Sequence, residues 1–186
     1  MADGKILLHS CCAPCSGAIL EHLVGSGAYP LVFFSNSNIF PKAEYDLRLS
    51  ELVRYARKVG VEVIEDEYDH EAWLAAVKGF EKERERGARC LRCFRFRLER
   101  AARYAGEHGF EVLTTTLASS RWKDLSQVDD AGLYACSLFP GVTWWGRNWR
   151  KGGLQQRRSE IIREQCFYNQ TFCGCEFSRR EERLEQ

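Results

Sequence analysis

The stretch that decides the fold is KILLHSCCAPCS, residues 5–16 of a 186-residue chain. Its first half is a short apolar run, which predicts a buried strand. Its second half carries cysteines at positions 11, 12 and 15, and apolar residues at helical spacing over residues 16–24 predict a helix directly afterwards. A buried strand that passes through a cysteine-rich turn into a helix is typical of an α/β fold.

The rest of the chain repeats this alternation of strand and helix. Further apolar runs predict strands at 30–34, 61–64, 110–116 and 142–145, and helical spacing predicts helices at 41–59, 70–79, 94–105, 124–136 and 154–164. The alternation predicts an α/β fold, Rossmann-like or HUP-like, with a mainly parallel sheet and helices on both faces. We expect a single domain over residues 1–178, ending in a cysteine-containing segment, and a loose charged tail over 179–186.

The charge of the chain is small but unevenly distributed. The formal net charge is +1, yet residues 89–163 contain 14 Lys and Arg against 7 Asp and Glu. A basic middle section suits a nucleic acid, and a solvated, arginine-rich helix face accounts for it equally well. No apolar run is long enough to span a membrane, and residues 1–6 lack the features of a signal peptide. We therefore expect a cytoplasmic protein with reduced thiols.

Seven of the nine cysteines fall into three groups far apart in the sequence. The groups are Cys11, Cys12 and Cys15; Cys90 and Cys93; and Cys173 and Cys175. Thiolates favour zinc, copper(I) and iron–sulfur clusters, and the carboxyl ends of parallel strands are where such a sheet gathers its sites. Seven thiols exceed what one zinc ion or one cubane cluster needs, so a cluster beside a second metal is favoured over structural zinc. A thiol–disulfide enzyme would leave two of the groups unexplained.

Seven sequence blocks include these cysteines or lie between them: HSCCAPC at 9–15, NSNIFP at 36–41, RCLRCFRFRL at 89–98, TTTL at 114–117, KGG at 151–153, QRRS at 156–159 and YNQTFCGC at 168–175. Taken together, these blocks resemble the QueH-type epoxyqueuosine reductase family. They follow the order of the family and span nearly the whole chain. Ser37 and Phe40 depart from the family, which usually has Pro and His there, and some members carry Asp in place of Cys15.

The resemblance implies an enzyme of tRNA queuosine biosynthesis. The family reduces the epoxide of epoxyqueuosine, at the wobble position of tRNA, to the cyclopentene of queuosine, independently of cobalamin. The implied cofactors are a [4Fe–4S] cluster and an adjacent mononuclear metal, expected to be iron. Electrons are expected from an external donor such as a ferredoxin or flavodoxin. We expect the cluster on Cys12, Cys90, Cys93 and Cys175, and the second metal on Cys11, Cys15 and Cys173; spacing alone does not determine this division.

The resemblance also supplies candidates for catalysis and substrate binding. They are His9, Asn36, Asn38, Glu44 and Tyr45, with Arg48 as a further pocket residue. Each has an ordinary structural alternative. His9 would be a buried, hydrogen-bonded histidine at a strand end, the two asparagines turn residues, Glu44 an acidic residue in a first helical turn, and Tyr45 part of an apolar helix face.

Basic and aromatic residues are the candidates for contact with RNA. Phosphate contacts are expected from Arg95, Arg97, Arg147, Arg150, Lys151, Arg157 and Arg158, and base stacking from Trp144, Trp145 or Trp149. The main alternative function is a zinc-stabilised RNA-binding module without redox activity. An ATP-dependent tRNA-modifying enzyme is disfavoured, because the first predicted strand is followed by cysteines and not by a glycine-rich phosphate loop.

Overall fold

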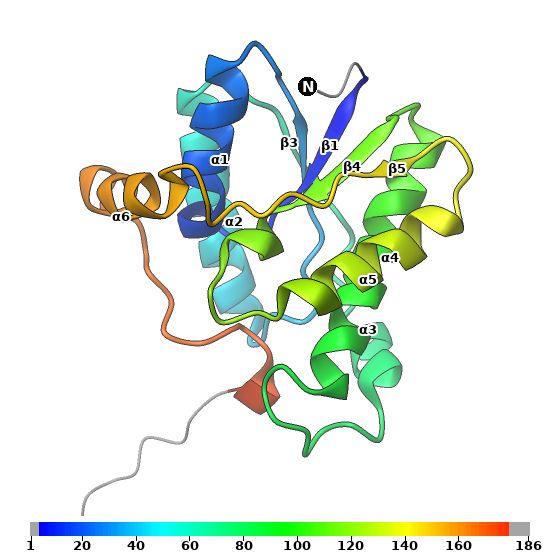
Figure 1. Cartoon of the computed structure of the whole chain (residues 1–186). Coiled ribbons are helices and arrows are strands. Elements are labelled where there is room, and N and C mark those ends of the chain that lie inside the picture. The colour runs from blue at the N-terminus through cyan, green and yellow to red at the C-terminus, as the bar shows by residue number, and fades with distance from the viewer. Residues whose placement is uncertain (1–3, 179–186) are drawn as a thin grey trace, which may run out of the picture.

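The computed structural model describes residues 4–178 and contains a five-stranded sheet (Figure 1). The strands are β1 (Ile6–His9), β2 (Leu31–Phe34), β3 (Val63–Glu65), β4 (Val112–Thr115) and β5 (Thr143–Trp144). All neighbouring pairs are parallel, in the order β3-β2-β1-β4-β5. The prediction of an α/β fold with a mainly parallel sheet is confirmed. The predicted loose tail at 179–186 lies outside the described residues.

Helices cover both faces of this sheet. They are α1 (Ala13–Gly25), α2 (Lys42–Lys58), α3 (His70–Val77), α4 (Ala88–Glu107), α5 (Leu125–Ser137) and α6 (Leu154–Glu164), with two short 3-10 helices, η1 (Thr116–Ser119) and η2 (Glu176–Ser178). Helices α1 and α2 lie on one side of the sheet and α4 and α5 on the other (Figure 1). Helix α1 also packs against α6, and α4 against α3. Among the described helices, none combines the length and apolar character that a bilayer crossing needs.

Strand β1 is the centre of the sheet, and the order in which successive strands are added reverses beside it, from one edge of the sheet to the other. Leu7 pairs with Leu31 of β2 on one side and with Leu113 of β4 on the other. All four residues of β1 and of β4 are buried, as expected for strands covered on both faces. The chain moves outward from β1 to β2 and β3, and then crosses back to β4. A crevice therefore opens at the carboxyl end of β1, where ligands bind in folds of this kind.

One close contact fixes how α5 lies against the edge of the sheet. Gly132, inside α5, lies directly under the indole of Trp144 in β5, and a Cβ at this position would overlap that ring. The indole Nε1 donates a hydrogen bond to Asp129 Oδ1 at 3.2 Å. The short β5 strand is thus held by a side chain that needs a glycine beneath it.

Replacing Gly132 with Ala is expected to destabilise the protein by about 1–3 kcal/mol, because the added methyl group forces the indole out of place. Gly106→Ala in α4 is the matched control. Its Cβ would meet Phe139 at 3.5 Å, an ordinary contact, so the change should stabilise the helix by about 0.5–1 kcal/mol. Urea unfolding measures both changes, and equal effects of the two substitutions would contradict the packing described.

Candidate metal centre and substrate cavity

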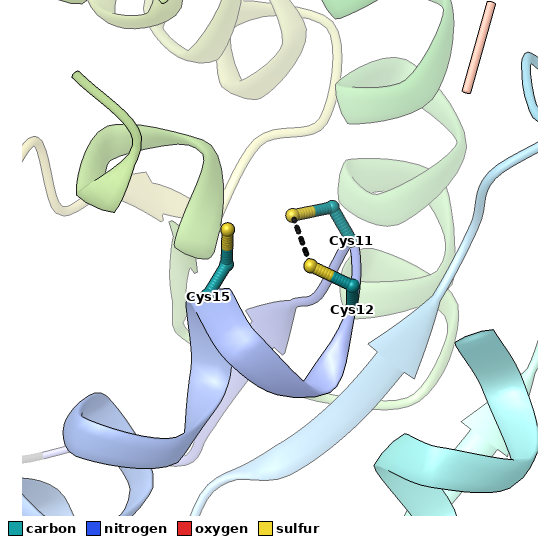
Figure 2. A group of neighbouring side chains, drawn as sticks. All are labelled: Cys11, Cys12 and Cys15. Carbon is teal, nitrogen blue, oxygen red and sulfur yellow. Dashed lines mark hydrogen bonds between the residues drawn. The ribbon is translucent and has the colours of Figure 1, made fainter. Parts of the chain in front are cut away.

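The first cysteine group lies at the carboxyl end of β1. Cys11 and Cys12 occupy the turn after the strand, and Cys15 lies in the first turn of α1. Their sulfurs all lie within 4.8 Å of one another, and Figure 2 shows them gathered on one side of the turn. All three are buried free thiols. Three soft donors this close, and away from water, suit a thiophilic metal ion.

Polar side chains from distant segments hold this group in place. Thr116 Oγ1, just after β4, accepts a hydrogen bond from the Cys11 backbone N–H at 3.1 Å and lies 3.4 Å from Cys11 Sγ. Gln170 Nε2 donates to Cys12 Sγ at 2.9 Å. Hydrogen bonds from Cys11 and Cys12, and then the positive charges of Arg158 and Lys123, lower the pKa of Cys15. The group therefore favours a thiolate at Cys15, the form that binds metal.

The second cysteine group combines α4 with the C-terminal segment. Cys90 and Cys93 are one turn apart at the start of α4, and Cys93 packs with Cys175 in a small buried cluster that includes Trp73. Burial, followed by the charges of nearby cysteines, raises the pKa of Cys90 to about 11 and that of Cys175 to about 12. Cys173 is among the neighbours that raise both values. Burial also raises the pKa of Cys93, and thiols with raised pKa values ionise together only when a cationic centre compensates their charge.

A cavity of about 1170 Å³ lies between the two groups. Cys11 and Cys15 line it from one group, and Cys90 and Cys173 from the other. Small-molecule sites are commonly about 300–1,000 Å³, so this cavity has room for a nucleoside-sized ligand beside a metal site. The sequence-predicted convergence of the three cysteine segments at one rim of the sheet is therefore what the described residues show.

Lys123 links the two groups, and it is not among the residues predicted from the sequence. Its Nζ lies 3.5 Å from Cys173 Sγ, and the side chain lines the cavity. Burial lowers its pKa, but negative charge on Cys173, Cys11 and Cys15 outweighs burial and raises the pKa above its usual value. Lys123 is thus a cation facing thiols of both groups. It belongs to no motif, since it stands alone in the loop between η1 and α5.

His9 shows the contacts of its structural alternative. It is fully buried, with Nδ1 2.7 Å from Thr115 Oγ1 and Nε2 3.1 Å from the Ser35 carbonyl oxygen. A carbonyl only accepts, so Nε2 carries the proton and Nδ1 accepts from the threonine hydroxyl. Burial and the charge of Arg97 lower the pKa of His9 to about 3. The ring is therefore neutral, and both of its nitrogens are engaged with the ends of β4 and β2.

The two asparagines after β2 both line the cavity but differ in their contacts. Asn36 Nδ2 donates to the Ser10 carbonyl at 2.8 Å, and Asn36 Oδ1 accepts from the buried Arg97 guanidinium. Asn38 Oδ1 is buried and has no hydrogen-bond partner within residues 4–178. A buried acceptor without a partner is costly unless a ligand supplies the donor. The Asn38 side-chain oxygen is therefore available to a bound molecule, whereas both ends of the Asn36 amide are used in hydrogen bonds within the cavity wall.

Glu44 and Tyr45 are both engaged by neighbouring side chains. The Tyr45 hydroxyl donates to Glu65 Oε1 at 3.0 Å, and its ring is buried. Glu44 accepts from Arg48 Nε at 2.8 Å, and Arg48 in turn donates to the Cys173 carbonyl at 3.0 Å. The pair of Glu44 and Arg48 therefore positions the segment that carries Cys173. Arg48 lines the cavity, as expected, while neither Glu44 nor Tyr45 is among the lining residues.

The loop that departs from the family pattern is tied to the C-terminal segment by His70. Phe40 stacks on His70, with ring centroids 5.0 Å apart and planes at 20°. His70 Nδ1 lies 2.7 Å from the Ser37 carbonyl, and Nε2 lies 2.9 Å from Glu176 Oε1. The two substituted positions, Ser37 and Phe40, thus contact a histidine that reaches the residue next to Cys175.

Most of the basic residues predicted to contact phosphate have partners inside the protein. Arg157 pairs with Glu21, Glu160 and Glu164. The others in this set are Arg95, paired with Asp130; Arg97, fully buried against Asn36; Arg147, over the rings of Trp145 and Trp149; and Arg150, bonded to the carbonyls of Ser120 and Lys123. These contacts fix loops and helices, and leave fewer cations for an external anion than the sequence suggests.

Arg158 and Lys151 differ from this set. Arg158 lines the cavity, and its buried Nε has no partner among the described residues. Lys151 is exposed. Of the three tryptophans predicted to stack on a base, Trp149 is only 1% exposed and so is a core residue, while Trp144 and Trp145 are half-buried. The arginine that faces the site is therefore the direct neighbour of one that does not.

Comparisons with known proteins point to one family. The family model described as Epoxyqueuosine reductase QueH matches residues 6–181. Proteins named Epoxyqueuosine reductase QueH from Haemophilus influenzae and Histophilus somni are 46% and 47% identical, over 97% and 95% of this chain and 75% and 73% of their own lengths. The protein of that name from Thermotoga maritima is 35% identical over 98% of this chain and 95% of its own length.

Replacing Arg157 with Gln is expected to lower the midpoint of urea unfolding at pH 7, because three glutamates lose their shared cation. Hydrogen bonds from Arg157 are the main cause of the lowered pKa of Glu21 and of Glu160. Their stabilisation is therefore complete above the ordinary glutamate pKa and is lost as the pH falls through the lower folded-state value. The difference between wild type and variant should shrink in acid, and a difference that stays constant would contradict the network.

Proposed function

Because this chain belongs to the epoxyqueuosine reductase QueH family, we propose that it reduces the epoxide of epoxyqueuosine in tRNA to the alkene of queuosine. The family places it among the oxidoreductases of queuosine biosynthesis. The observation that carries the proposal is the cavity flanked by two groups of thiols, of which five are buried and two, Cys90 and Cys173, are half-buried. Reduction breaks both C–O bonds of the epoxide, takes up two electrons and two protons, and releases water. An external donor such as a ferredoxin or flavodoxin would supply the electrons, independently of cobalamin.

The donor set fits a cluster beside a mononuclear metal. From the sequence, Cys12 is expected among the cluster ligands and Cys173 among the ligands of the mononuclear metal. The geometry favours the reverse assignment of these two cysteines. Cys90, Cys93, Cys173 and Cys175 would provide the four thiolates that a [4Fe–4S] cluster needs. Cys11, Cys12 and Cys15 provide three, which leaves a four-coordinate metal, here proposed as iron, one open position. When bound, the two centres would supply single electrons and Lewis acidity towards oxygen.

Side chains of the cavity wall bind and orient the substrate. Asn38 Oδ1 accepts a hydrogen bond from a hydroxyl or N–H group of the modified base, which satisfies its unused acceptor. Lys123 Nζ offers N–H donors and positive charge to the epoxide oxygen, where negative charge builds up as the C–O bonds break. Arg158 meets a phosphate. His9 and Glu44 act on the substrate only indirectly, through the strand ends and through the Cys173 segment.

Turnover under anaerobic conditions tests the function directly. The protein is purified without oxygen, supplied with a chemical reductant, and incubated with tRNA that contains epoxyqueuosine, with and without added iron. Conversion to queuosine, detected by mass spectrometry of the nucleosides, is the expected result. A protein that contains zinc, lacks acid-labile sulfide and leaves the epoxide intact would instead be the RNA-binding module considered as the alternative.

Cysteine substitutions separate the two centres. Cys175→Ser is expected to remove most of the acid-labile sulfide, since it deletes a cluster ligand, whereas Cys11→Ala should keep the sulfide and lose roughly one iron per chain. Cys15→Asp should keep both, because a carboxylate also binds iron. Iron and sulfide analysis after anaerobic purification measures these changes.

Cys166→Ser is the matched control, because Cys166 is exposed and lies outside both groups. It should leave iron and sulfide unchanged. Loss of sulfide from Cys11→Ala as large as that from Cys175→Ser would show that the two thiol groups do not hold separate centres.

Neighbouring arginines test the RNA footprint. Arg158→Gln is expected to weaken tRNA binding several-fold and to reduce the slope of log affinity against log salt by about one, since one phosphate contact is lost. Arg157→Gln removes the same charge one residue away, from an arginine already paired with three glutamates, and should retain most of the affinity and the slope. Filter binding over a range of salt concentrations measures both variants. Equal losses of affinity from the two substitutions would show that Arg158 makes no phosphate contact of its own.

A further inference from the structure

Trp122 is the most exposed large apolar side chain of residues 4–178, and it lines the cavity. Its exposed fraction is 70%. The exposed aromatic nearest to it in this measure, Tyr29 at 66%, does not line the cavity. Single exposed apolar residues are common on protein surfaces and need no explanation. An indole uncovered in the wall of a cavity that also contains four of the clustered cysteines is a different case.

The loop that carries Trp122 is anchored both before and after this residue in the sequence. The Arg150 guanidinium donates to the Ser120 carbonyl at 2.6 Å and to the Lys123 carbonyl at 2.8 Å. Asp124 then caps α5 by accepting hydrogen bonds from backbone N–H groups of its first turn. The exposure of Trp122 is therefore a property of an anchored loop. This gives Arg150, which was predicted to contact phosphate, a supporting role in the loop that carries Trp122.

One cation lies over the Trp122 ring, and others line the same cavity. The Arg121 guanidinium lies 5.2 Å from the centroid of the Trp122 ring. Six lining residues are cationic and two are acidic: Arg48, Arg86, Arg97, Arg121, Lys123 and Arg158 against Glu85 and Asp124. Within the described part of the chain, Arg86, Arg121 and Arg158 form no ion pair with a carboxylate. An exposed aromatic face among unpaired arginines is the combination that binds single-stranded nucleic acid.

We propose that Trp122 is a stacking platform for a nucleobase next to the modified nucleotide, with Arg121 against one face of the indole and the base against the other. The proposal rests on the proposed function, in which the substrate is a tRNA. The modified nucleotide has to leave the anticodon stack for its epoxide to reach the thiol-lined cavity, and its neighbour then loses a stacking partner. The indole replaces that partner, and the arginines of the wall meet the phosphates on either side.

Binding of a short RNA tests the proposal. The anaerobically purified enzyme is titrated with an anticodon stem–loop that carries epoxyqueuosine, and its dissociation constant is measured by fluorescence anisotropy. Trp122→Ala is expected to weaken binding about tenfold, and Trp122→Phe to recover most of the loss, because stacking needs an aromatic face. Tyr29→Ala, an equally exposed aromatic outside the cavity, is the control and should bind as the wild type does.

An RNA with one base removed identifies the stacking partner. An abasic site is placed on one side or the other of the modified nucleotide. On one side it should weaken binding to the wild type about tenfold and leave binding to Trp122→Ala unchanged, since the partner is already missing. Equal losses in both proteins, for both abasic positions, would overturn the proposal.

Failure of this proposal is distinguishable from failure of the proposed function. A wild type that does not reduce the epoxide overturns both. A wild type that reduces it, together with a Trp122→Ala variant of unchanged affinity, overturns only the stacking role. A third outcome concerns the electron donor. If Trp122→Ala binds RNA normally and turns over normally with dithionite, but slowly with a ferredoxin or flavodoxin, the indole belongs to the docking surface of the electron donor. This outcome would likewise overturn the stacking role.

Discussion

The hydrogen bonds of His9 are the interaction on which the rim of the sheet depends. The ring accepts a hydrogen bond from the Thr115 hydroxyl at the end of β4 and donates one to the Ser35 carbonyl, just after β2. It therefore ties three adjacent strands at the level where the chain enters the cysteine turn. Burial disfavours the charged form of the ring, and the positive charge of Arg97 disfavours it further, so His9 stays neutral. A fixed rim is what allows Cys11 and Cys12 to be directed by a turn of only a few residues.

The second constraint is the closure of the C-terminal segment over that rim. Its contacts come from separate parts of the fold: Arg48 holds the Cys173 carbonyl, Gln170 reaches Cys12, and Glu176 meets His70. Cys175 then packs beside Trp73 and Cys93. These contacts position the segment by ordinary hydrogen bonding and packing, so the site is partly organised by the protein itself. A metal bound as proposed would offset the cost of ionising the buried thiols and would stabilise this arrangement further.

The fold was predictable because its strands and helices have clear periods, and the convergence of the cysteines followed from the geometry of parallel sheets. The role of individual cations was not. Arg157 and Arg158 look equivalent in sequence, but successive residues of α6 point in different directions, so one meets three glutamates and the other the cavity. The division of the cysteines depends on distances that only the tertiary structure sets. Lys123 and Trp122 stand in a loop with no motif, where sequence carries no sign of what lies opposite.

The cations of the cavity reduce the repulsion that is expected between its two proposed occupants, the thiolate-bound metal centres and the RNA. Thiolate-bound metal centres are rich in negative charge, and RNA is a polyanion, so bringing them together in a partly dry cavity is unfavourable without intervening cations. The cations of the cavity wall differ in how deeply they are buried and in which groups they face. Arg97 is buried beside His9 and Asn36, Lys123 faces thiols of both groups, and Arg121 lies over an exposed ring. Under the proposed function, the inner cations would offset the thiolates, and the outer ones would remain for the phosphates of the RNA.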